Sequence, residues 1–426
     1  MKHRIVILGA GYAGAIAAGR LARRLNRDDV DITLVNAEPD FVERIRMHQV
    51  AVGEELRHRS LREILAGTGV ALRVARVTAI DVDRRTVSLR GPVGSGSAGS
   101  GGSADGVGGV GGAVGFDGAV GLDGAAELGY DTLVYALGSS WDDGGVPGVA
   151  EHAHHIAGRT GALRLRERLA SLAPGRRVVV VGGGLTGIEA ATEIAEARGD
   201  LDVALVARGD LGDWLSPKGR RHLRETVDRL GITLHEHTGV ERVGATEVMA
   251  GDVGLPADVT VWSAGFGVQP IASATALTVS SRGQVVVDET MRSVSHPEVY
   301  AVGDAALAEG PLGNPLRMSC ASAIPMAWQA ADAIAARLTG GKLPSTSLAY
   351  IHQCISLGRR DAIIQMVTTD DRARPSAPGG RLAARHKELI CRYVAWAVAH
   401  PMPYPVRRRR VAGQTAPAGS VADVAR

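Results

Sequence analysis

Two glycine-rich turns of the same kind constrain the fold of this chain more than any other feature. Each follows a run of apolar residues and has the spacing G-x-G-x-x-G, with Gly9, Gly11 and Gly14 in the first turn and Gly182, Gly184 and Gly187 in the second. In such a turn the first glycine permits the tight bend, the second lets the backbone approach a pyrophosphate, and the third allows close helix–strand packing. Each stretch therefore predicts a buried parallel strand, a phosphate-binding turn and a helix whose N-terminus faces the phosphates.

Both turns belong to a complete strand–helix–strand unit. The stretches "AIAAGRLARRL" and "DITLV" follow the first turn, and "IEAATEIAEARG" and "DVALVA" follow the second. A glycine-rich turn without a ligand is the alternative, but the surrounding elements favour nucleotide binding. Two complete units imply two dinucleotides facing each other, and therefore electron transfer between them. The N-terminus resembles a secretory signal, but its glycines interrupt the apolar stretch, and we interpret it as a strand.

Composition excludes several other classes of function. The chain of 426 residues is long enough for two or three domains, and its net charge of +3 gives no overall field that would attract nucleic acid. Its three cysteines, Cys320, Cys354 and Cys391, lie far apart and form no C-x-x-C pair. This usage fits a reducing, cytoplasmic compartment and argues against disulfide scaffolds and zinc sites. We predict no metal site.

Further segments resemble a known family of flavoproteins. The segments "YDTLVYALGSS", "GGVPGV", "VTVWSAGF" and "HPEVYAVGDAA" follow one another in the order seen in the FAD-dependent pyridine nucleotide oxidoreductases, which carry two dinucleotide-binding domains. The stretch "GGGLTGIEAA" is most similar to the type II NADH dehydrogenase group. The resemblance implies an α/β fold with two Rossmann-like dinucleotide-binding domains, the second inserted in the first, and a small C-terminal α+β domain.

The resemblance also gives expected domain bounds. Residues 1–157 and 283–345 are expected to form the FAD-binding domain, and residues 158–282 the NAD(P)H-binding domain. Residues 346–426 are expected to form a C-terminal interface domain with a basic tail. Residues 91–124 are rich in glycine and serine, a composition that cannot bury a core, and we interpret them as a flexible surface insertion in the FAD domain. Use of this tract as a binding tail is the alternative.

Several residues are candidates for holding FAD. Asn36 ends the second strand, where an acidic side chain would accept hydrogen bonds from a ribose, and Glu38 is the nearest substitute. The resemblance implies that four more residues line the cofactors, namely Gly138, Gly265, Gly303 and Asp304. Of these, Asp304 would meet the ribityl and phosphate region of FAD.

The strand "DVALVA" bears on the choice of nicotinamide. A site for NAD usually offers an acid at the end of this strand, whereas a nearby arginine suits the 2′-phosphate of NADP. The chain offers Ala207 and Arg208, with Asp210 further on. This arrangement slightly favours NADPH, and the alternative is an Arg208 that points to solvent.

The candidate catalytic residues are Glu189, His48 and Gln329. The resemblance places Glu189 near the nicotinamide and flavin rings, and stabilisation of the helix dipole is its other interpretation. His48 and Gln49 are placed beside the flavin, to hydrogen-bond it or to handle a proton. A packing role for His48 is an equal alternative. Gln329, with Ala327, is the nearest match to the Ala-Gln motif that lines the quinone site of type II dehydrogenases.

The C-terminal region is expected to lie on the acceptor side. Residues 350–365 predict two strands joined by a glycine turn, and the helix before them is expected to start near Pro325. A final helix places four apolar residues on one side, namely Leu382, Leu389, Tyr393 and Trp396. Such a helix would pack on the protein body or form a homodimer, with the arginines at 407–410 in a solvated tail. Peripheral membrane contact is the alternative.

The sequence therefore predicts an enzyme that takes hydride from NAD(P)H onto FAD and passes electrons to a small acceptor, first of all a quinone-like molecule. No cysteine precedes Cys320, so the first part of the FAD domain, residues 1–157, lacks the redox cysteine that disulfide reductases of this architecture carry, and thiol–disulfide chemistry through such a residue is excluded. Two alternatives are a reductase of a soluble iron–sulfur partner or biosynthetic metabolite, and an FAD-binding redox sensor. We expect a cytoplasmic protein that is at most peripheral on the inner face of the membrane.

Overall fold

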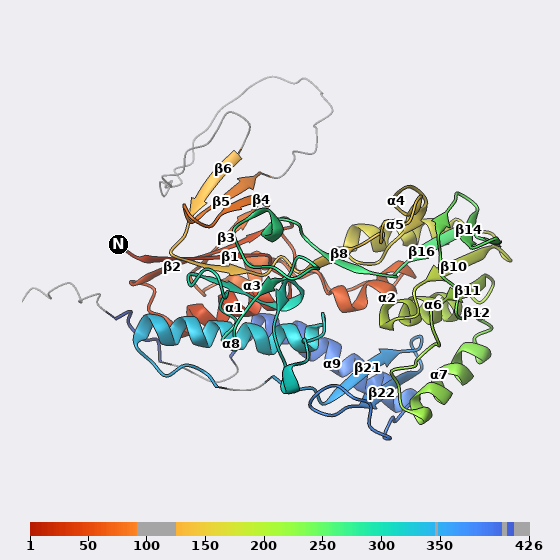
Figure 1. Cartoon of the computed structure of the whole chain (residues 1–426). Coiled ribbons are helices and arrows are strands. Elements are labelled where there is room, and N and C mark those ends of the chain that lie inside the picture. Colours follow the sequence, from red (N-terminus) through yellow and green to blue (C-terminus); the bar gives the residue numbers. More distant parts are fainter. Residues whose placement is uncertain (92–124, 346–347, 403–406, 413–426) are drawn as a thin grey trace, which may run out of the picture.

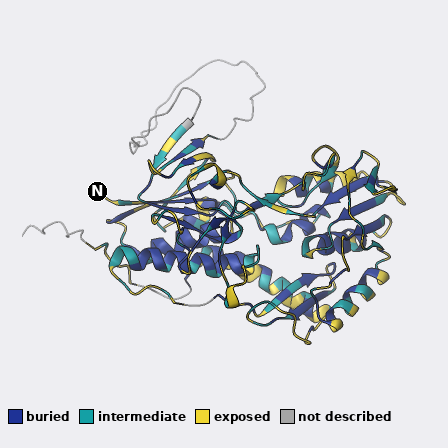
Figure 2. Ribbon diagram, viewed as in Figure 1, coloured by how far each residue is buried: buried dark blue, intermediate teal, exposed yellow. Residues whose placement is uncertain are grey.

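The structure is a computed structural model that describes residues 1–91, 125–345, 348–402 and 407–412. Figure 1 shows two lobes, each built on a parallel sheet, with a C-terminal hairpin and helix beside them. Apart from residue 91, the predicted flexible insertion lies outside the described residues, as does most of the C-terminal tail. Both sheets are largely buried, as the dark ribbons of Figure 2 show.

The first sheet has five parallel strands in the order β19-β7-β1-β2-β3. These are β1 (His3–Leu8), β2 (Val30–Asn36), β3 (Val70–Val74), β7 (Thr132–Tyr135) and β19 (Val299–Ala301). The start of the chain is thus a strand, as predicted. Strand β19 enters this sheet only after the second sheet is complete.

The second sheet repeats the arrangement with the order β12-β11-β10-β16-β9. Its strands are β9 (Ala153–His154), β10 (Arg177–Val181), β11 (Asp202–Val206), β12 (Thr233–His235) and β16 (Val259–Trp262). Because its residues interrupt the chain between β7 and β19, the second unit is inserted in the first. The structure therefore confirms the predicted α/β fold with two Rossmann-like units.

Small residues let helices pack closely on the first sheet. The helix α1 (Tyr12–Arg24), rich in alanine and glycine, lies against α8 (Cys320–Thr339), and both are mostly buried. Helix α8 begins at Cys320, before the expected start at Pro325, because Ser319 caps it by accepting a hydrogen bond from the Ser322 amide. In the second lobe α6 (Leu185–Ala197) packs on β10 and β11.

Shorter elements complete the two lobes. The strands β4 (Arg76–Asp81), β5 (Thr86–Arg90) and β6 (Ala125–Gly129) form a separate antiparallel sheet beside the first. The remaining helices and strands of the two lobes are α2 (Met47–Ala51), α3 (Leu61–Leu65), α4 (Val149–His152), α5 (Arg159–Ala170), α7 (Pro217–Arg229), β8 (Ser139–Trp141), β13 (Arg242–Val243), β14 (Glu247–Ala250), β15 (Val253–Pro256), β17 (Phe266–Val268), β18 (Val285–Val286) and β20 (Ala306–Leu307).

The C-terminal region forms the predicted hairpin and helix. Strands β21 (His352–Ser356) and β22 (Ala362–Met366) pair antiparallel, and α9 (Arg381–Ala399) packs on them and on α1. The arginines at 407–410 are exposed, as predicted, but two of them also contact the body of the protein. Arg408 Nε donates to the carbonyl of Ala22, and the Arg410 guanidinium pairs with buried Asp29 at 2.9 Å.

Within residues 1–91, 125–345, 348–402 and 407–412, no helix is both long enough and apolar enough to cross a bilayer.

Candidate active site

The first glycine turn leaves open space where a phosphate would lie. Gly9 has a φ of 93°, and a Cβ there would lie 2.3 Å from the carbonyl oxygen of Ala136. A Cβ on Gly14 would lie 1.8 Å from the oxygen of Gly9, whereas a Cβ on Gly11 would meet nothing within 4 Å. The outer glycines are therefore required by packing, and the middle one borders free space at the N-terminus of α1. This geometry fits a pyrophosphate.

The second turn has the same construction. Gly182 has a φ of 122°, and a Cβ there would lie 2.8 Å from the carbonyl carbon of Ser263. A Cβ on Gly187 would lie 1.8 Å from the oxygen of Gly182, but a Cβ on Gly184 would meet nothing within 4 Å. Each lobe thus carries its own phosphate-sized opening before a helix of 13 residues.

Asn36 braces the first turn. Its Oδ1 accepts a hydrogen bond from the Ala10 amide at 2.9 Å, and its Nδ2 donates to the carbonyl of Glu38 at 2.8 Å. The Glu38 side chain itself is exposed. Asn36 therefore holds the loop in shape, and Glu38 is the acid available to a ribose nearby.

Asp304 lies where the carboxyl ends of β7 and β19 meet. The Ser139 hydroxyl donates to its Oδ2 at 2.6 Å, and the guanidinium of Arg44 donates to the carbonyl of Ser139 at 2.7 Å. Gly138 and Gly303, which flank this contact, have φ values of 68° and 72°. Burial lowers the pKa of Arg44, although the Asp304 carboxylate opposes the shift. The arrangement places a carboxylate and an arginine beside the first phosphate opening.

A buried cluster of three ionisable side chains joins both lobes to the C-terminal region. Glu189, on α6, accepts hydrogen bonds at Oε1 from Lys387 Nζ at 2.5 Å and from the Ser356 amide at 3.0 Å. Its Oε2 lies 3.8 Å from His48 Nδ1, on α2. Lys387 Nζ, on α9, also donates to the carbonyl of Cys354 at 2.9 Å. The exposed fractions of Glu189 and His48 are only 9% and 4%.

The three members of this cluster have different charges. Burial favours the neutral form of Glu189, but Lys387, His48 and two hydrogen bonds outweigh it and lower the pKa of the carboxyl. Burial likewise disfavours the ammonium of Lys387, but the Glu189 charge raises its pKa above the ordinary value. Burial, assisted by Lys387, lowers the pKa of His48 to about 4. At neutral pH the cluster is therefore an ion pair beside a neutral imidazole.

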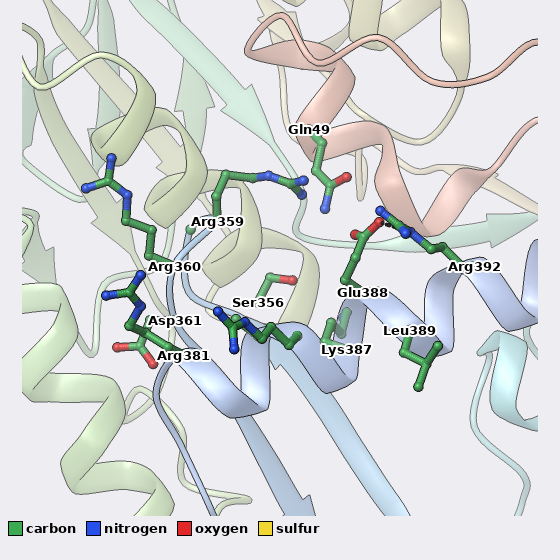
Figure 3. A pocket seen from close by; sticks show the side chains of 13 residues that line it. Gln49, Ser356, Arg359, Arg360, Asp361, Arg381, Lys387, Glu388, Leu389 and Arg392 are labelled. Atoms are coloured by element: carbon green, nitrogen blue, oxygen red, sulfur yellow. Dashed lines mark hydrogen bonds and ion pairs between the residues drawn. The ribbon is translucent and has the colours of Figure 1, made fainter.

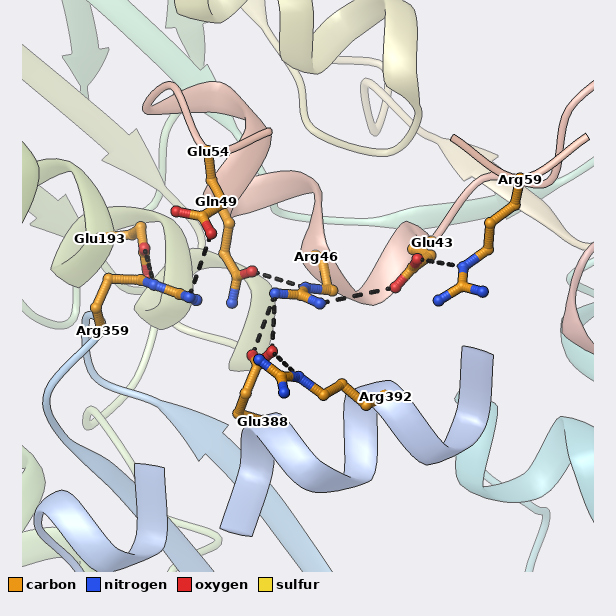
Figure 4. Close-up of polar contacts among 9 residues, drawn as sticks. All are labelled: Glu43, Arg46, Gln49, Glu54, Arg59, Glu193, Arg359, Glu388 and Arg392. Carbon is orange, nitrogen blue, oxygen red and sulfur yellow. Dashed lines mark hydrogen bonds and ion pairs between the residues drawn. The ribbon is translucent and has the colours of Figure 1, made fainter. Parts of the chain in front are cut away.

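A second carboxyl lies one helical turn further along α6. Glu193 is 1% exposed, and its oxygens have no hydrogen-bond partner within the described part of the chain. Its nearest cation is Arg359, whose Nε lies 3.8 Å away and which also faces Glu54 (Figure 4). Burial raises the pKa of Glu193 to about 8. This carboxyl can therefore gain or lose a proton near neutral pH.

Two adjoining cavities open beside the cluster. One, of about 450 Å³, is lined by Gln49 from α2, by the turn between β21 and β22, and by α9, including Lys387 (Figure 3). The other, of about 510 Å³, lies around Arg46 and Glu388. Arg46 Nε donates to Gln49 Oε1 at 2.8 Å, and Arg46 Nη2 donates to the Glu388 carboxylate at 3.2 Å (Figure 4).

Other predicted site residues lie apart from this cluster. Gln329, on α8, donates from Nε2 to the carbonyl of Glu289 at 2.5 Å. Gly265 follows β16, and a Cβ there would lie 3.6 Å from that of Asp142. The exposed Arg208 has no ion pair among the described residues, whereas Asp210 contacts Arg220 and His237.

The cysteines are poorly suited to thiolate chemistry. Burial raises the pKa of Cys354 to about 12 and that of Cys391 to about 11, although Lys387 opposes both shifts. Burial also raises the pKa of Cys320. The three thiols are therefore protonated at neutral pH, which leaves the redox chemistry to bound cofactors.

Lys387 is the residue of this site that sequence reasoning missed. It comes from a helix 198 positions away from Glu189 in the chain, and no local pattern joins the two.

Comparison with known proteins gives a consistent family. Residues 3–335 match the pyridine nucleotide-disulphide oxidoreductase family. The chain is 25% identical to the demethylphylloquinone reductase NdbB of Synechocystis over 412 residues, which cover 93% of each chain. It is 29% identical over 350 residues to an NADH dehydrogenase-like protein of Mycobacterium tuberculosis, covering 76% of this chain and 78% of the relative.

Solved structures share the fold. The sulfide:quinone oxidoreductase of Aquifex aeolicus superposes with a TM-score of 0.73 at 18% identity, over 94% of this chain and 92% of that one. NDH2 of Plasmodium falciparum in complex with NADH gives a TM-score of 0.72 at 13% identity, over 95% and 99% of the two chains. With two phosphate-sized openings and the family match, the chain belongs to the pyridine nucleotide-disulphide oxidoreductase family and is an FAD-dependent NAD(P)H oxidoreductase.

Proposed function

We propose that the chain oxidises NAD(P)H and reduces a quinone-like acceptor. The observation that carries this proposal is the buried Glu189–Lys387 pair with neutral His48, where α2, α6, β21 and α9 meet beside a cavity. Bound FAD would supply the redox chemistry, taking hydride from the nicotinamide and passing electrons to the acceptor. The names of the relatives, which include a demethylphylloquinone reductase and a type II NADH:quinone oxidoreductase, agree with a quinone.

Each lobe would hold one cofactor. In this proposal residues 1–157 and 283–345 bind FAD, with the backbone around Gly11 on its pyrophosphate, Glu38 on its ribose and Asp304 on its ribityl region. Residues 158–282 bind NAD(P)H, with the backbone around Gly184 on its pyrophosphate. The helix dipoles of α1 and α6 favour these negative charges.

The side chains of the cluster would have separate roles. Glu189 positions Lys387, whose ammonium lines the cavity and can donate a hydrogen bond to a carbonyl oxygen of the acceptor. His48, which is neutral, has an Nε2 without a partner among the described residues and can accept or donate a hydrogen bond at the flavin. Reduction of a quinone to a quinol consumes one proton from solvent besides the hydride.

NADPH is the favoured donor within this proposal. Arg208, at the end of β11, is exposed and has no ion pair within the described residues. Asp210, the nearest acid, is already engaged by Arg220 at 3.0 Å and His237 at 3.1 Å. An arginine without a partner beside an occupied acid suits a 2′-phosphate better than a 2′-hydroxyl.

We also infer that α9 rests on a membrane surface. Leu382, Leu389, Tyr393 and Trp396 form one exposed stripe, with exposed fractions from 42% to 76%. Exposed aromatic and aliphatic side chains on one face of a helix suit the interface of a bilayer.

The test of this function is an anaerobic absorbance titration of the purified protein with NADH and NADPH in parallel. We expect a yellow protein that NADPH bleaches faster than NADH, and rapid recovery of colour on addition of 2-methyl-1,4-naphthoquinone. A flavin that neither nucleotide bleaches would contradict the proposal and favour a redox sensor. Bleaching without recovery, except by an iron–sulfur protein, would replace the quinone with that partner.

A further inference from the structure

The cavity beside Lys387 carries a large excess of positive charge. Its volume is about 450 Å³, and six cationic side chains line it against two carboxylates. The cations are Arg359, Arg360, Arg381, Arg385, Lys387 and Arg392. Figure 3 shows Arg359 and Arg392 reaching toward the space beside Gln49. Such a concentration of one charge in a concave site raises the local concentration of ligands of opposite charge.

The two carboxylates are already engaged by other residues. Asp361 accepts hydrogen bonds from His222 at 2.8 Å and from Arg229 at 2.9 Å, both on α7. Glu388 is shared between Arg46 at 3.2 Å and Arg392 at 2.9 Å. Neither carboxylate is therefore available to neutralise the remaining arginines of the cavity.

Three arginines of the lining have no partner of their own. Arg360, Arg381 and Arg385 are exposed at the mouth and make no ion pair or hydrogen bond with any described residue. Arginine presents a planar set of donors that matches a carboxylate, phosphate or sulfonate in two parallel hydrogen bonds. The mouth of the cavity thus offers several such sites to an incoming anion.

The inner end of the cavity is different. The buried residues Gln49 and Ser356 line it together with Lys387, which contacts Glu189. Ala384 and Leu389, the latter 64% exposed, add apolar surface on α9 nearer the mouth. A ligand that fits the whole space has hydrogen-bonding oxygens at the inner end and a ring with negative groups toward the mouth.

We propose that this cavity selects an electron acceptor that carries carboxylate, phosphate or sulfonate groups on a quinone-like ring. The inference rests on the proposed function and names the class of acceptor. The acceptor gains two electrons and one proton from the hydride of NAD(P)H and a second proton from solvent, giving NAD(P)⁺ and the quinol. An uncharged quinone would make no charged contact with the three arginines.

A comparison of two acceptors tests the selection. The anionic 1,4-naphthoquinone-2-sulfonate and the uncharged 2-methyl-1,4-naphthoquinone are assayed with the double variant Arg381→Gln/Arg385→Gln. The ratio of kcat/KM for the anionic to the uncharged acceptor cancels any general loss of activity. We expect this ratio to fall about tenfold or more, since 1.4 kcal/mol of lost interaction is a factor of ten. Arg282→Gln, which removes an exposed charge outside the cavity, should leave it unchanged.

Three results would overturn the proposal. The first is an unchanged ratio in the double variant, which would make the arginines irrelevant to the acceptor. The second is a rise in KM for NADPH with no change for the anionic acceptor, which would assign the arginines to the nucleotide. The third is displacement of the anionic acceptor by phosphatidylglycerol vesicles, which would assign the cavity to a lipid headgroup. We expect no such displacement.

A binding measurement separates this inference from the redox function. Calorimetric titration with naphthalene-2-sulfonate, which cannot be reduced in this way, needs neither NAD(P)H nor turnover. We expect saturable binding that weakens with added salt and is about tenfold weaker in the double variant. Binding with no bleaching of the flavin would contradict the proposed function alone, whereas bleaching without binding would contradict the anionic acceptor alone.

Discussion

At the residue scale, removing the charge of Lys387 or Glu189 from solvent is unfavourable for either residue alone, and the ion pair between them offsets that cost. Their side chains are only 13% and 12% exposed, and each keeps its charge because the other is 2.5 Å away. Removing one partner from a buried pair typically costs about 3–5 kcal/mol, because the remaining charge is left without compensation. Replacing both with apolar residues of similar size is far less costly.

This contrast gives a first prediction. Lys387→Met should lower the free energy of unfolding by about 3 kcal/mol or more, and Lys387→Met/Glu189→Leu should recover most of the loss. Urea unfolding at pH 7 measures both, with the exposed Lys342→Met as the control. Equal stability of Lys387→Met and the wild type would show that the pair is not buried as described.

A second prediction concerns His48 and acid. Its pKa in the folded protein is about 4, against 6.5 in a model peptide, so the unfolded chain binds the extra proton first as pH falls. The contribution of His48 to the free energy of unfolding is therefore fully present above pH 6.5. It declines by about 3 kcal/mol as the pH falls toward 4. His48→Gln should flatten this decline in unfolding curves measured between pH 6.5 and 4. Exposed His58→Gln should not, and an equal effect of both variants would refute the assignment.

At the element scale, the two glycine turns separate the requirements of packing from those of binding. Gly184 has φ −76° and ψ 177°, which any residue can adopt, and a Cβ there meets nothing. Gly187 has no such freedom, because a Cβ would lie 1.8 Å from the oxygen of Gly182. Neighbouring glycines of one motif should therefore respond differently to substitution.

The third prediction follows from this difference. Gly184→Val should keep the fold and the FAD content while abolishing bleaching by NADPH, because its side chain fills the phosphate opening. Gly187→Ala should instead lower the melting temperature. Gly11→Val, its counterpart in the first lobe, should lose FAD and retain the fold. A Gly184→Val protein that still binds NADPH normally would place the pyrophosphate elsewhere.

The exposed stripe of α9 gives a fourth prediction. Leu389→Ser/Trp396→Ser should reduce sedimentation with vesicles that contain phosphatidylglycerol, because burial of these side chains in the interface drives binding. Leu312→Ser, an exposed apolar residue on another element, is the matched control. Unchanged sedimentation, joined to a concentration-dependent increase in size that the double variant loses, would assign the stripe to a second copy of the chain.

Sequence reasoning succeeded where structure is determined locally. The strands before each glycine turn, the helices after them and the C-terminal hairpin all have signals within a few residues. The start of α8 was predicted too late, because a proline is a familiar marker of a helix start. The residue that caps the helix is Ser319, six positions earlier. The contacts of Arg410 with Asp29 could not be predicted, since 381 residues separate the two.

At the scale of the whole molecule, the proposed site belongs to no single domain. Gln49 and His48 come from the first lobe, Glu189 from the second, and Lys387 from the final helix. The motifs identify the two cofactor sites separately, because each is built within one strand–helix unit. The cavity beside Lys387, lined from α2, from the turn after β21 and from α9, forms only once α9 has folded into place, and for this reason its arginines carried no signal in the sequence.

The hairpin of β5 and β6 has a consequence for engineering the protein. Arg90 and Ala125 are paired in register, so the two ends of the chain that flank the glycine- and serine-rich tract lie about 5 Å apart. A segment that replaces the tract can therefore join β5 to β6 whether it is short or long. The position could therefore accept a fluorescent protein or an affinity tag, at a sheet edge remote from both phosphate openings, and so report on the enzyme inside living cells.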